Sequence, residues 1–168
     1  RNVPQEVKTT NPINAALFNG VTKTNSYDGT NAVMISCGDK HSLILLDTGT
    51  VVSFGQLEYG RLGIDYDLNA VAIYGAGLSK PVDMDTIGSY DGTNAVMISA
   101  GKETTAVLLE TGKVMTCGHN DLKQCGHLLG VGSTYNKYQP TLASVSGGGD
   151  YNGTNAVMIQ MYNNSGSI

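Results

Sequence analysis

The sequence is poor in several residue types that proteins use for particular kinds of contact. It has no tryptophan, two phenylalanines and only two arginines, and its formal net charge is −4. A nucleic-acid-binding protein normally carries a basic face, and this charge balance provides none. No apolar run approaches the roughly 18 residues of a membrane-spanning helix. The sequence therefore argues against nucleic acid and against a membrane as partners.

Cysteines are too few and too unevenly placed for a disulfide framework. The chain has three, Cys37, Cys117 and Cys125, and an odd number cannot pair within one chain. Reduced thiols are the simpler interpretation, and they favour a reducing intracellular compartment.

Glycine and tyrosine are abundant, with 22 and 9 residues, while charged residues make up only 14%. This composition is typical of a turn-rich β protein. An internal repeat dominates the sequence: SYDGTNAVMIS occupies 26–36 and recurs unchanged at 89–99, and DYNGTNAVMIQ at 150–160 is a close third copy. The equivalent tyrosines are Tyr27, Tyr90 and Tyr151, so the periods are 63 and 61 residues.

Each repeat has the pattern of four short strands. YDGTN is a tight turn, because Asp before Gly supplies side-chain bonding and a positive φ. AVMIS is a short apolar run that predicts a strand buried on both faces. HSLILLDTG or TTAVLLETG then predicts a second strand and a hairpin turn, and TVVSFG or KVMTCG the returning third strand. A short fourth strand is expected near Pro81 and near Pro140.

Four strands at a fixed period indicate a β-propeller blade, so the predicted fold class is all-β, with blades of four-stranded antiparallel sheets. We divide the chain into an end of a preceding blade plus an insertion at 1–25, a first repeat at 26–88, a second at 89–149, and the first strand of a third at 150–168.

One stretch, TCGHNDLKQCGH, contains four residue types that bind zinc. They are Cys117, His119, Cys125 and His127. Aligning the repeats places both cysteines where the first repeat has large apolar residues, and unpaired cysteine behaves as a small buried hydrophobe. Cys-x-His is also not the usual Cys-x-x-Cys spacing. We therefore predict structural cysteines and no metal or other cofactor, with a metal site at these four residues as the alternative.

The first repeat resembles the repeat of the regulator of chromosome condensation family. The matching residues are Gly38, His41-Ser42-Leu43, Asp47-Thr48-Gly49, Val51, Phe54-Gly55, and Gly60 with Leu62-Gly63, while Arg61 stands where the family has glutamine. The second repeat keeps most of this pattern but has Thr104 in place of histidine, Cys117 in place of an aromatic residue and Lys123 in place of glycine. The resemblance implies a seven-bladed propeller when complete.

Two repeats and part of a third cannot close such a ring, since single repeats do not bury their faces. Either the chain is a piece of a longer propeller, which we favour, or several copies assemble as a homo-oligomer that completes the ring.

Candidate contact residues lie where the repeats differ, because binding residues concentrate on loops carried by a rigid scaffold. The stretches 64–80 and 127–139 differ in length and sequence and are rich in tyrosine, which gives large contact area at low entropic cost. The predicted partner-binding residues are Tyr66, Tyr74, Tyr135, Tyr138, Glu58, Tyr59 and Arg61.

No catalytic set is apparent, and His41 is expected to have a structural role, bonded to backbone in the next turn. We therefore expect a non-enzymatic scaffold that binds a protein partner through variable loops. The resemblance also implies an alternative, a module like a guanine nucleotide exchange factor for a small GTPase.

Overall fold

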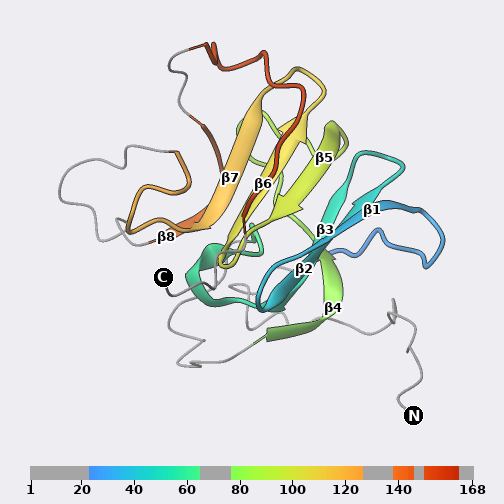
Figure 1. Cartoon of the computed structure of the whole chain (residues 1–168). Helices are drawn as coiled ribbons and strands as arrows, with labels where there is room; N and C mark the ends of the chain where they lie inside the picture. Colours follow the sequence, from blue (N-terminus) through green and yellow to red (C-terminus); the bar gives the residue numbers. More distant parts are fainter. Residues whose placement is uncertain (1–22, 65–76, 127–137, 146–149, 163–168) are drawn as a thin grey trace.

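The computed structural model describes residues 23–64, 77–126, 138–145 and 150–162, which form two four-stranded antiparallel sheets (Figure 1). Blade one contains β1 (Ala32–Cys37), β2 (His41–Leu46), β3 (Val51–Gln56) and β4 (Gly77–Asp83). Blade two contains β5 (Ala95–Ala100), β6 (Thr104–Leu109), β7 (Val114–His119) and β8 (Tyr138–Ser144). In both sheets the strands follow one another in chain order.

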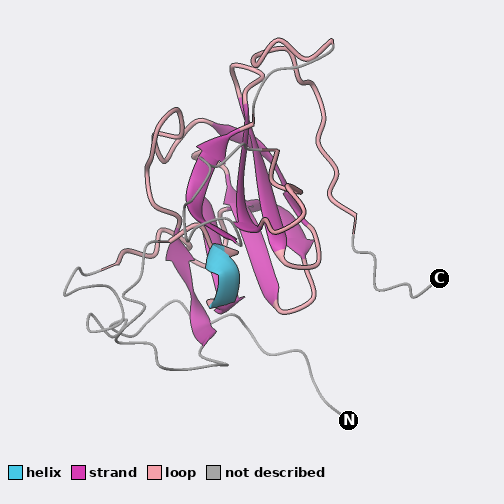
Figure 2. Ribbon diagram, turned by 90° about the vertical axis from the view of Figure 1, so that its left-hand side faces the viewer, coloured by secondary structure: helices cyan, strands magenta, loops and turns pink. Residues whose placement is uncertain are grey.

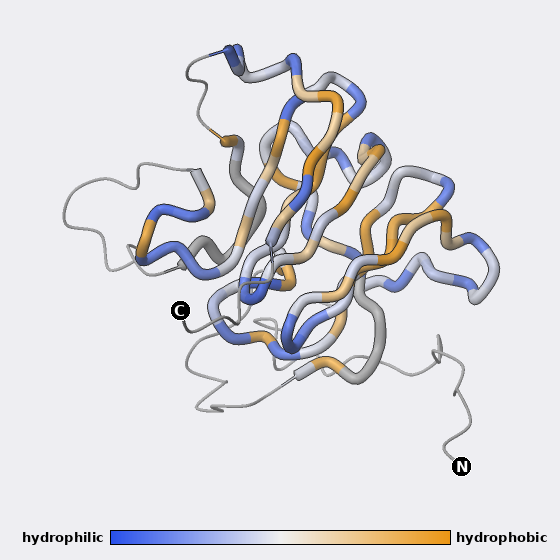
Figure 3. The backbone as a smooth tube through the Cα atoms, viewed as in Figure 1, coloured by the Kyte–Doolittle hydropathy of each residue, from blue (hydrophilic) through white to orange (hydrophobic). Residues whose placement is uncertain are grey.

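Strands dominate the described part of the chain, which contains a single short helical turn, η2 (Glu58–Gly60) (Figure 2). No helix among these residues is long and apolar enough to cross a membrane. Hydrophobic residues follow the strands and hydrophilic ones gather at the turns (Figure 3). This is the distribution expected when short strands bury their side chains between sheets.

The YDGTN segments form the predicted tight turns, in which an aspartate side chain replaces backbone bonding. Asp28 Oδ1 accepts hydrogen bonds from the backbone N–H of Thr30, at 2.7 Å, and of Asn31, at 3.0 Å. These bonds, that of Thr30 first, lower the pKa of Asp28. The same bonding recurs at Asp91 and at Asn152. The turn chemistry read from the sequence is thus confirmed in all three copies.

The hairpin glycines serve both the turn and the contact between neighbouring repeats. Gly49 follows β2 with φ +79°, a conformation that side chains disfavour, and its N–H donates to the carbonyl of Leu46. A Cβ atom at Gly49 would overlap the Thr93 carbonyl of the next repeat. Gly112, with φ +75°, stands in the same relation to Thr154. These turns can approach the next repeat only without a side chain.

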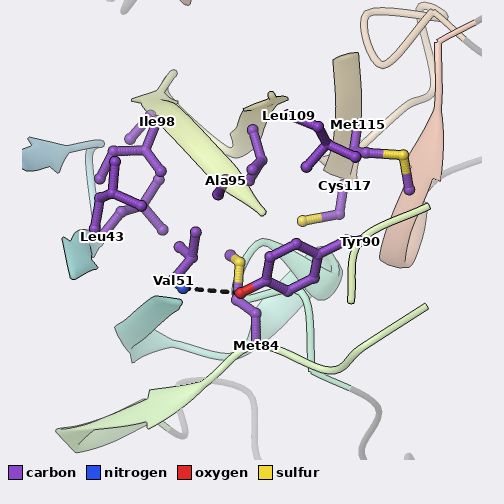
Figure 4. Packing of buried hydrophobic residues seen from close by; sticks show 12 residues of the cluster. Leu43, Val51, Met84, Tyr90, Ala95, Ile98, Leu109, Met115 and Cys117 are labelled. Carbon is purple, nitrogen blue, oxygen red and sulfur yellow. Dashed lines mark hydrogen bonds between the residues drawn. The ribbon is translucent and has the colours of Figure 1, made fainter. Parts of the chain in front are cut away.

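The largest core cluster lies between the two blades (Figure 4). Blade one contributes β2 and β3 side chains, blade two contributes β5, β6 and β7 side chains, and Met84 and Tyr90 come from the connecting segment. Its fully or nearly fully buried members include Leu43, Leu45, Val51, Met84, Tyr90, Ile98, Val107, Leu109, Met115 and Cys117. Each sheet therefore buries one face against the other.

Polar bonds complete this contact. The hydroxyl of Tyr90 accepts a hydrogen bond from the backbone N–H of Val51 at 2.8 Å, and it lies within the core (Figure 4). The N–H of Ala100 donates to Ser36 Oγ at 2.8 Å, and that of Ala95 donates to the Gly49 carbonyl. Burial raises the pKa of Tyr90 to about 12, so its hydroxyl stays protonated.

The third copy of the repeat docks on blade two through the same bonds. The N–H of Val114 donates to Tyr151 Oη at 3.0 Å, and the N–H of Met161 donates to Ser99 Oγ at 2.7 Å. The N–H of Ala156 donates to the Gly112 carbonyl at 3.1 Å. The joint between blades is therefore a repeated structure, specified by residues that recur at the period of the sequence.

The prediction that every AVMIS run is buried on both faces was wrong for two copies. Most of β5 is buried, but β1 is largely exposed, with Val33 at 62% and Ile35 at 72%. Residues 156–162 form no strand, and Val157 is 89% exposed. The reason is that burial of an inner strand comes from the preceding blade and its own sheet, and only β5 has both among the described residues.

We expect the Tyr90→Phe substitution to reduce the free energy of unfolding by about 1–3 kcal/mol, because it leaves the buried Val51 N–H without an acceptor. Tyr151→Phe is the matched control: the bond of Tyr151 to Val114 is only partly buried, so water can replace it and the loss should be smaller. Urea denaturation of both variants measures the difference. Equal losses of unfolding free energy in the two variants would contradict a dominant role for the contact between blades one and two.

Candidate protein-interaction surface at the seam between blades

The structure describes three of the predicted contact residues fully, and these come together in and beside η2. Glu58 and Tyr59 belong to this turn and Arg61 follows it directly. Tyr138 begins β8, where its backbone pairs with His119, and its side chain lies outside the described part. The remaining predicted contact residues also lie outside it: Tyr66, Tyr74 and Tyr135.

Arg61 lies beneath the surface rather than on it. Its side chain is fully buried, and Nε donates to the carbonyl of Glu58 at 2.8 Å. One terminal nitrogen is 3.9 Å from the carboxylate of Glu58 and 3.8 Å from that of Glu103. Because Glu58 belongs to the turn after β3 of blade one and Glu103 to blade two, Arg61 joins the two blades electrostatically. Its buried side chain holds the neighbouring carboxylates in place.

Tyr59 is held in a conformation that few residues adopt. Its φ of 63° and ψ of 8° are left-handed, which costs a non-glycine residue about 1 kcal/mol or more. Its ring centroid lies 4.5 Å from that of His119, and the guanidinium carbon of Arg61 lies 5.3 Å from the ring centroid. The Glu58 carboxylate, then burial and Glu103, raise the pKa of Tyr59. The surrounding groups thus fix a half-buried aromatic ring.

His119 links this turn to two carboxylates of blade two. Its Nδ1 lies 3.2 Å from Glu103, and its Nε2 lies 3.4 Å from Asp121. The side chains of Glu58, Glu103 and Asp121 remain 29%, 27% and 44% exposed. We call this group the seam cluster; its members are Glu58, Tyr59, Arg61, Glu103, His119 and Asp121.

Glu103 and Asp121 were not among the residues predicted from the sequence. A signal for Glu103 does exist: it aligns with Lys40 of the first repeat, and His119 aligns with Gln56. Charge therefore changes between repeats at one end of the strands, while the apolar pattern is kept. Positions of this kind are the ones that could adapt to a partner without disturbing the blades.

His41 connects the blades next to the seam cluster. It is only 3% exposed, and its Nε2 lies 2.9 Å from Thr105 Oγ1, which itself donates to the Arg61 carbonyl at 2.7 Å. Since the threonine proton is used in that bond, Nε2 carries the imidazole proton and donates. The role is structural, as predicted, and the ring bonds to a side chain of the next blade. Burial, with Arg61 nearby, lowers the pKa of His41 to about 4.

The candidate zinc ligands serve separate contacts in the structure. Cys117 is buried in the core between blades, and Cys125 is buried with its Sγ donating to the His119 carbonyl at 3.3 Å. Burial raises the pKa of Cys125 to about 12 and that of Cys117 well above the usual value. His127 lies outside the described residues, and within them no three His, Cys, Asp or Glu side chains are grouped to hold a metal.

The sequence matches the Regulator of chromosome condensation (RCC1) repeat twice, at residues 33–61 and 96–124. These segments run from β1 to the η2 turn and from β5 through β7 to the matching turn of blade two. The chain is 29% identical over 133 residues to the human RCC1-like G exchanging factor-like protein, which is 79% of this chain and 25% of that protein. It is 38% identical over 88 residues to the Drosophila melanogaster Regulator of chromosome condensation, covering 52% of this chain and 14% of the fly protein.

Solved structures show the same architecture. Prp20p from Saccharomyces cerevisiae superposes with a TM-score of 0.56 at 16% identity, covering 74% of this chain and 28% of the yeast chain. Human WBSCR16 superposes with a TM-score of 0.55 at 24% identity, covering 74% of this chain and 29% of the human chain. The two sheets are therefore blades of a β-propeller.

The kind of repeat follows from the sequence match: residues 33–61 and 96–124 of this propeller are repeats of the regulator of chromosome condensation type. The chain spans a quarter or less of the length of these curated relatives. Similar repeats also occur in larger proteins such as the mouse serine/threonine-protein kinase Nek9, which is 30% identical over 92 residues, 55% of this chain and 8% of the kinase.

Stability should fall in mild acid because of His41. Its pKa is about 4 in the folded protein and about 6.5 in an unfolded chain, so the unfolded chain binds the proton first as pH falls. The contribution is complete above pH 6.5 and is lost between pH 6.5 and pH 4, by an amount on the order of 3 kcal/mol. Urea denaturation between pH 4 and pH 6.5 measures the free energy of unfolding. In the control variant His41→Gln this free energy should depend less steeply on pH. If the variant shows the same pH dependence as the parent protein, His41 is not the group responsible.

Lys123 should carry backbone strain, since its φ is 66° where the first repeat has Gly60 at φ 74°. Replacing Lys123 by glycine relieves this strain and should raise the free energy of unfolding by about 0.5–1 kcal/mol. Lys123→Ala removes the same charge but keeps Cβ, and should give no gain. A similar gain in both variants, measured by denaturation, would show that charge rather than backbone conformation is responsible.

Proposed function

We propose that this chain is a non-enzymatic protein-interaction module whose partner binds at the seam cluster. The observation that carries this proposal is the fully buried Arg61, which lies between Glu58 and Glu103 and orders an aromatic pair beside them. A strained residue such as Tyr59 persists only where its surroundings over-determine it, and such strain concentrates at functional sites. The cluster is preorganised, which lowers the entropy cost of binding.

The chemistry of the seam cluster favours a basic side chain from the partner. Three carboxylates are partly exposed, and the arginine that lies beside two of them, Glu58 and Glu103, is completely buried. A lysine or arginine could contact these carboxylates and the face of the Tyr59 ring together, combining an ion pair with a cation–π contact. The net charge of −4 would also draw a basic partner toward the protein.

The predicted tyrosines would extend this surface. Tyr138 pairs through its backbone with His119, so it enters the sheet directly beside the seam cluster. Tyr66, Tyr74 and Tyr135 belong to the variable stretches that connect the third and fourth strands of each blade. We propose that these stretches select the partner, while the seam cluster supplies a fixed anchor.

A module resembling a nucleotide exchange factor is the second candidate. It is supported by the human RCC1-like G exchanging factor-like protein, whose match covers 79% of this chain. Prp20p, which shares the fold, binds Gsp1p and histones. Release of labelled GDP from a small GTPase, with and without the chain, separates this candidate from simple binding, because a binding module leaves the release rate unchanged.

Binding to a basic probe protein tests the proposed anchor. We expect labelled core histones to bind the chain at low salt, and Glu103→Gln to weaken this binding about fivefold or more, as loss of a charge pair at an interface does. Glu110→Gln is the matched control, since Glu110 is exposed at the opposite end of β6 and carries the same charge. Fluorescence anisotropy gives both dissociation constants, and thermal melting confirms that both variants fold.

Two results would contradict the proposal. If Glu103→Gln and Glu110→Gln weaken binding equally, then net charge attracts the histones and the seam cluster is not the site. If the chain binds no histone at all, then the chemistry proposed for the partner is wrong.

A further inference from the structure

The turn of the third repeat has an asparagine where the other two copies have an aspartate. Asn152 stands at the position of Asp28 and Asp91, and each of the three is followed by glycine and threonine. All three residues are exposed, including Asp91, whose turn stands between blade one and blade two. Exposure is therefore a property of this turn in every copy of the repeat. Because glycine has no Cβ, it leaves the side-chain amide of the preceding asparagine open to attack by the main chain.

The side-chain oxygen of Asn152 already accepts two hydrogen bonds. Its Oδ1 lies 2.9 Å from the backbone nitrogen of Thr154 and 3.1 Å from the Thr154 hydroxyl. The equivalent distances are 2.7 and 2.9 Å at Asp28, and 2.8 and 3.0 Å at Asp91. At both aspartates these bonds, that of the backbone N–H first, lower the pKa of the carboxyl. The turn thus has the same geometry in all three copies and suits a carboxylate, to which hydrogen bonds are shorter.

The main-chain nitrogen next to this amide belongs to Gly153 and is open to solvent. Gly153 has φ +94°, and a Cβ atom at this position would have no neighbouring heavy atom within 4 Å. Among the residues that the structure describes, the N–H of Gly153 donates to no acceptor. Hydroxide from solvent can therefore reach this N–H and remove its proton.

The two donors of Thr154 lie where negative charge develops during an attack on the amide. When the deprotonated nitrogen of Gly153 bonds to Cγ of Asn152, the carbonyl electron pair moves to Oδ1. The N–H and the hydroxyl of Thr154 both point at this oxygen, as the donors of an oxyanion hole do. The bond from Cγ to Nδ2 then breaks, and Nδ2 takes a proton from water and leaves as ammonia. A cyclic succinimide remains.

Water then opens the succinimide at one of its two carbonyl carbons. Attack at Cγ breaks the new bond and leaves aspartate, whereas attack at the main-chain carbonyl leaves isoaspartate, which has one more carbon in the main chain. The oxygen on Cγ is the one that faces the donors of Thr154, and they polarise this carbonyl toward water. The turn therefore favours aspartate as the product.

We propose that Asn152 is a site of spontaneous deamidation, which the Thr154 donors promote and which gives the third turn the aspartate of the other two copies. Aspartate keeps the main-chain length between Tyr151 and Ala156, both of which bond to blade two. The modification adds one negative charge at an exposed turn and strengthens the hydrogen bonds within it.

The rate of amide loss in the folded chain, compared with the same chain unfolded in urea, tests this proposal. Both samples are kept in the same mildly alkaline buffer, and peptide mapping by mass spectrometry follows asparagine, aspartate and isoaspartate at position 152. We expect Asn152 to be lost at least as fast in the folded chain as in urea, with aspartate as the main folded-state product. Retention of Asn152 in the folded chain while it is lost in urea would overturn the proposal, and so would isoaspartate as the main folded-state product.

Two variants of Thr154 isolate the effect of its hydroxyl. Thr154→Val removes this donor and should slow amide loss about threefold or more in the folded chain, with no change in urea. This is much less than the loss on removing a buried oxyanion donor, because water can replace an exposed hydroxyl. Thr154→Ser keeps the hydroxyl and should match the parent chain. If Thr154→Val loses the amide as fast as the parent chain does, the turn does not promote the reaction.

Asn152→Asp places the proposed product in the turn directly. Hydrogen exchange at the amides of Val114 and Met161, which bond across the contact with the third copy, should be as slow as in the parent chain or slower. Asn155→Asp is the matched control, because Nδ2 of Asn155 donates to the carbonyl of Asp150 at 2.8 Å and a carboxylate cannot make this bond. This control should exchange faster at both amides. Faster exchange in Asn152→Asp would show that the turn does not accept aspartate and would overturn the proposal.

Discussion

A four-stranded sheet of short strands has two apolar faces and cannot bury either of them alone, and the rest of this structure depends on that constraint. Leu43, Leu45 and Val51 of blade one are buried against blade two. Each such side chain gains at most about 1.5–3 kcal/mol from burial. The burial free energy of three such side chains is of the same order as the net free energy of unfolding of a typical domain, about 5–15 kcal/mol. Blade one owes much of its stability to blade two, and the same holds for blade two and whatever covers its other face.

Repetition explains why so much of the fold could be predicted from the sequence. The period fixes equivalent strands, and the Asp-Gly and Asn-Gly turns recur. The tyrosines of the second and third copies, Tyr90 and Tyr151, each bond to a strand of the previous repeat. Burial of individual strands could not be predicted in the same way. β1 and β5 have nearly identical sequences but opposite exposure, because a neighbouring blade rather than local sequence decides it.

The seam cluster could be predicted only in part, for a related reason. Glu58 and Tyr59 stand in a turn that a sequence pattern can locate. The burial of Arg61 and its contact with Glu103 depend on how one blade is placed on the next, across 42 residues of sequence. Charges in this cluster also differ between repeats, so the repeat itself gives no guide to them. The charged residues that distinguish one repeat from another thus gather at the contact between blades, while the strands themselves follow the common repeat pattern.

The most direct test of this account is native-state hydrogen exchange in increasing denaturant, because it measures whether the blades open together. The Val51 amide is the key reporter, since it donates to Tyr90 of the next repeat. The account predicts that Val51, the strand amides of blade one and those of blade two exchange through a single opening with one free energy. Exchange of the blade-one amides at clearly lower denaturant, with blade two still protected, would contradict the claim that the contact between blades holds both together.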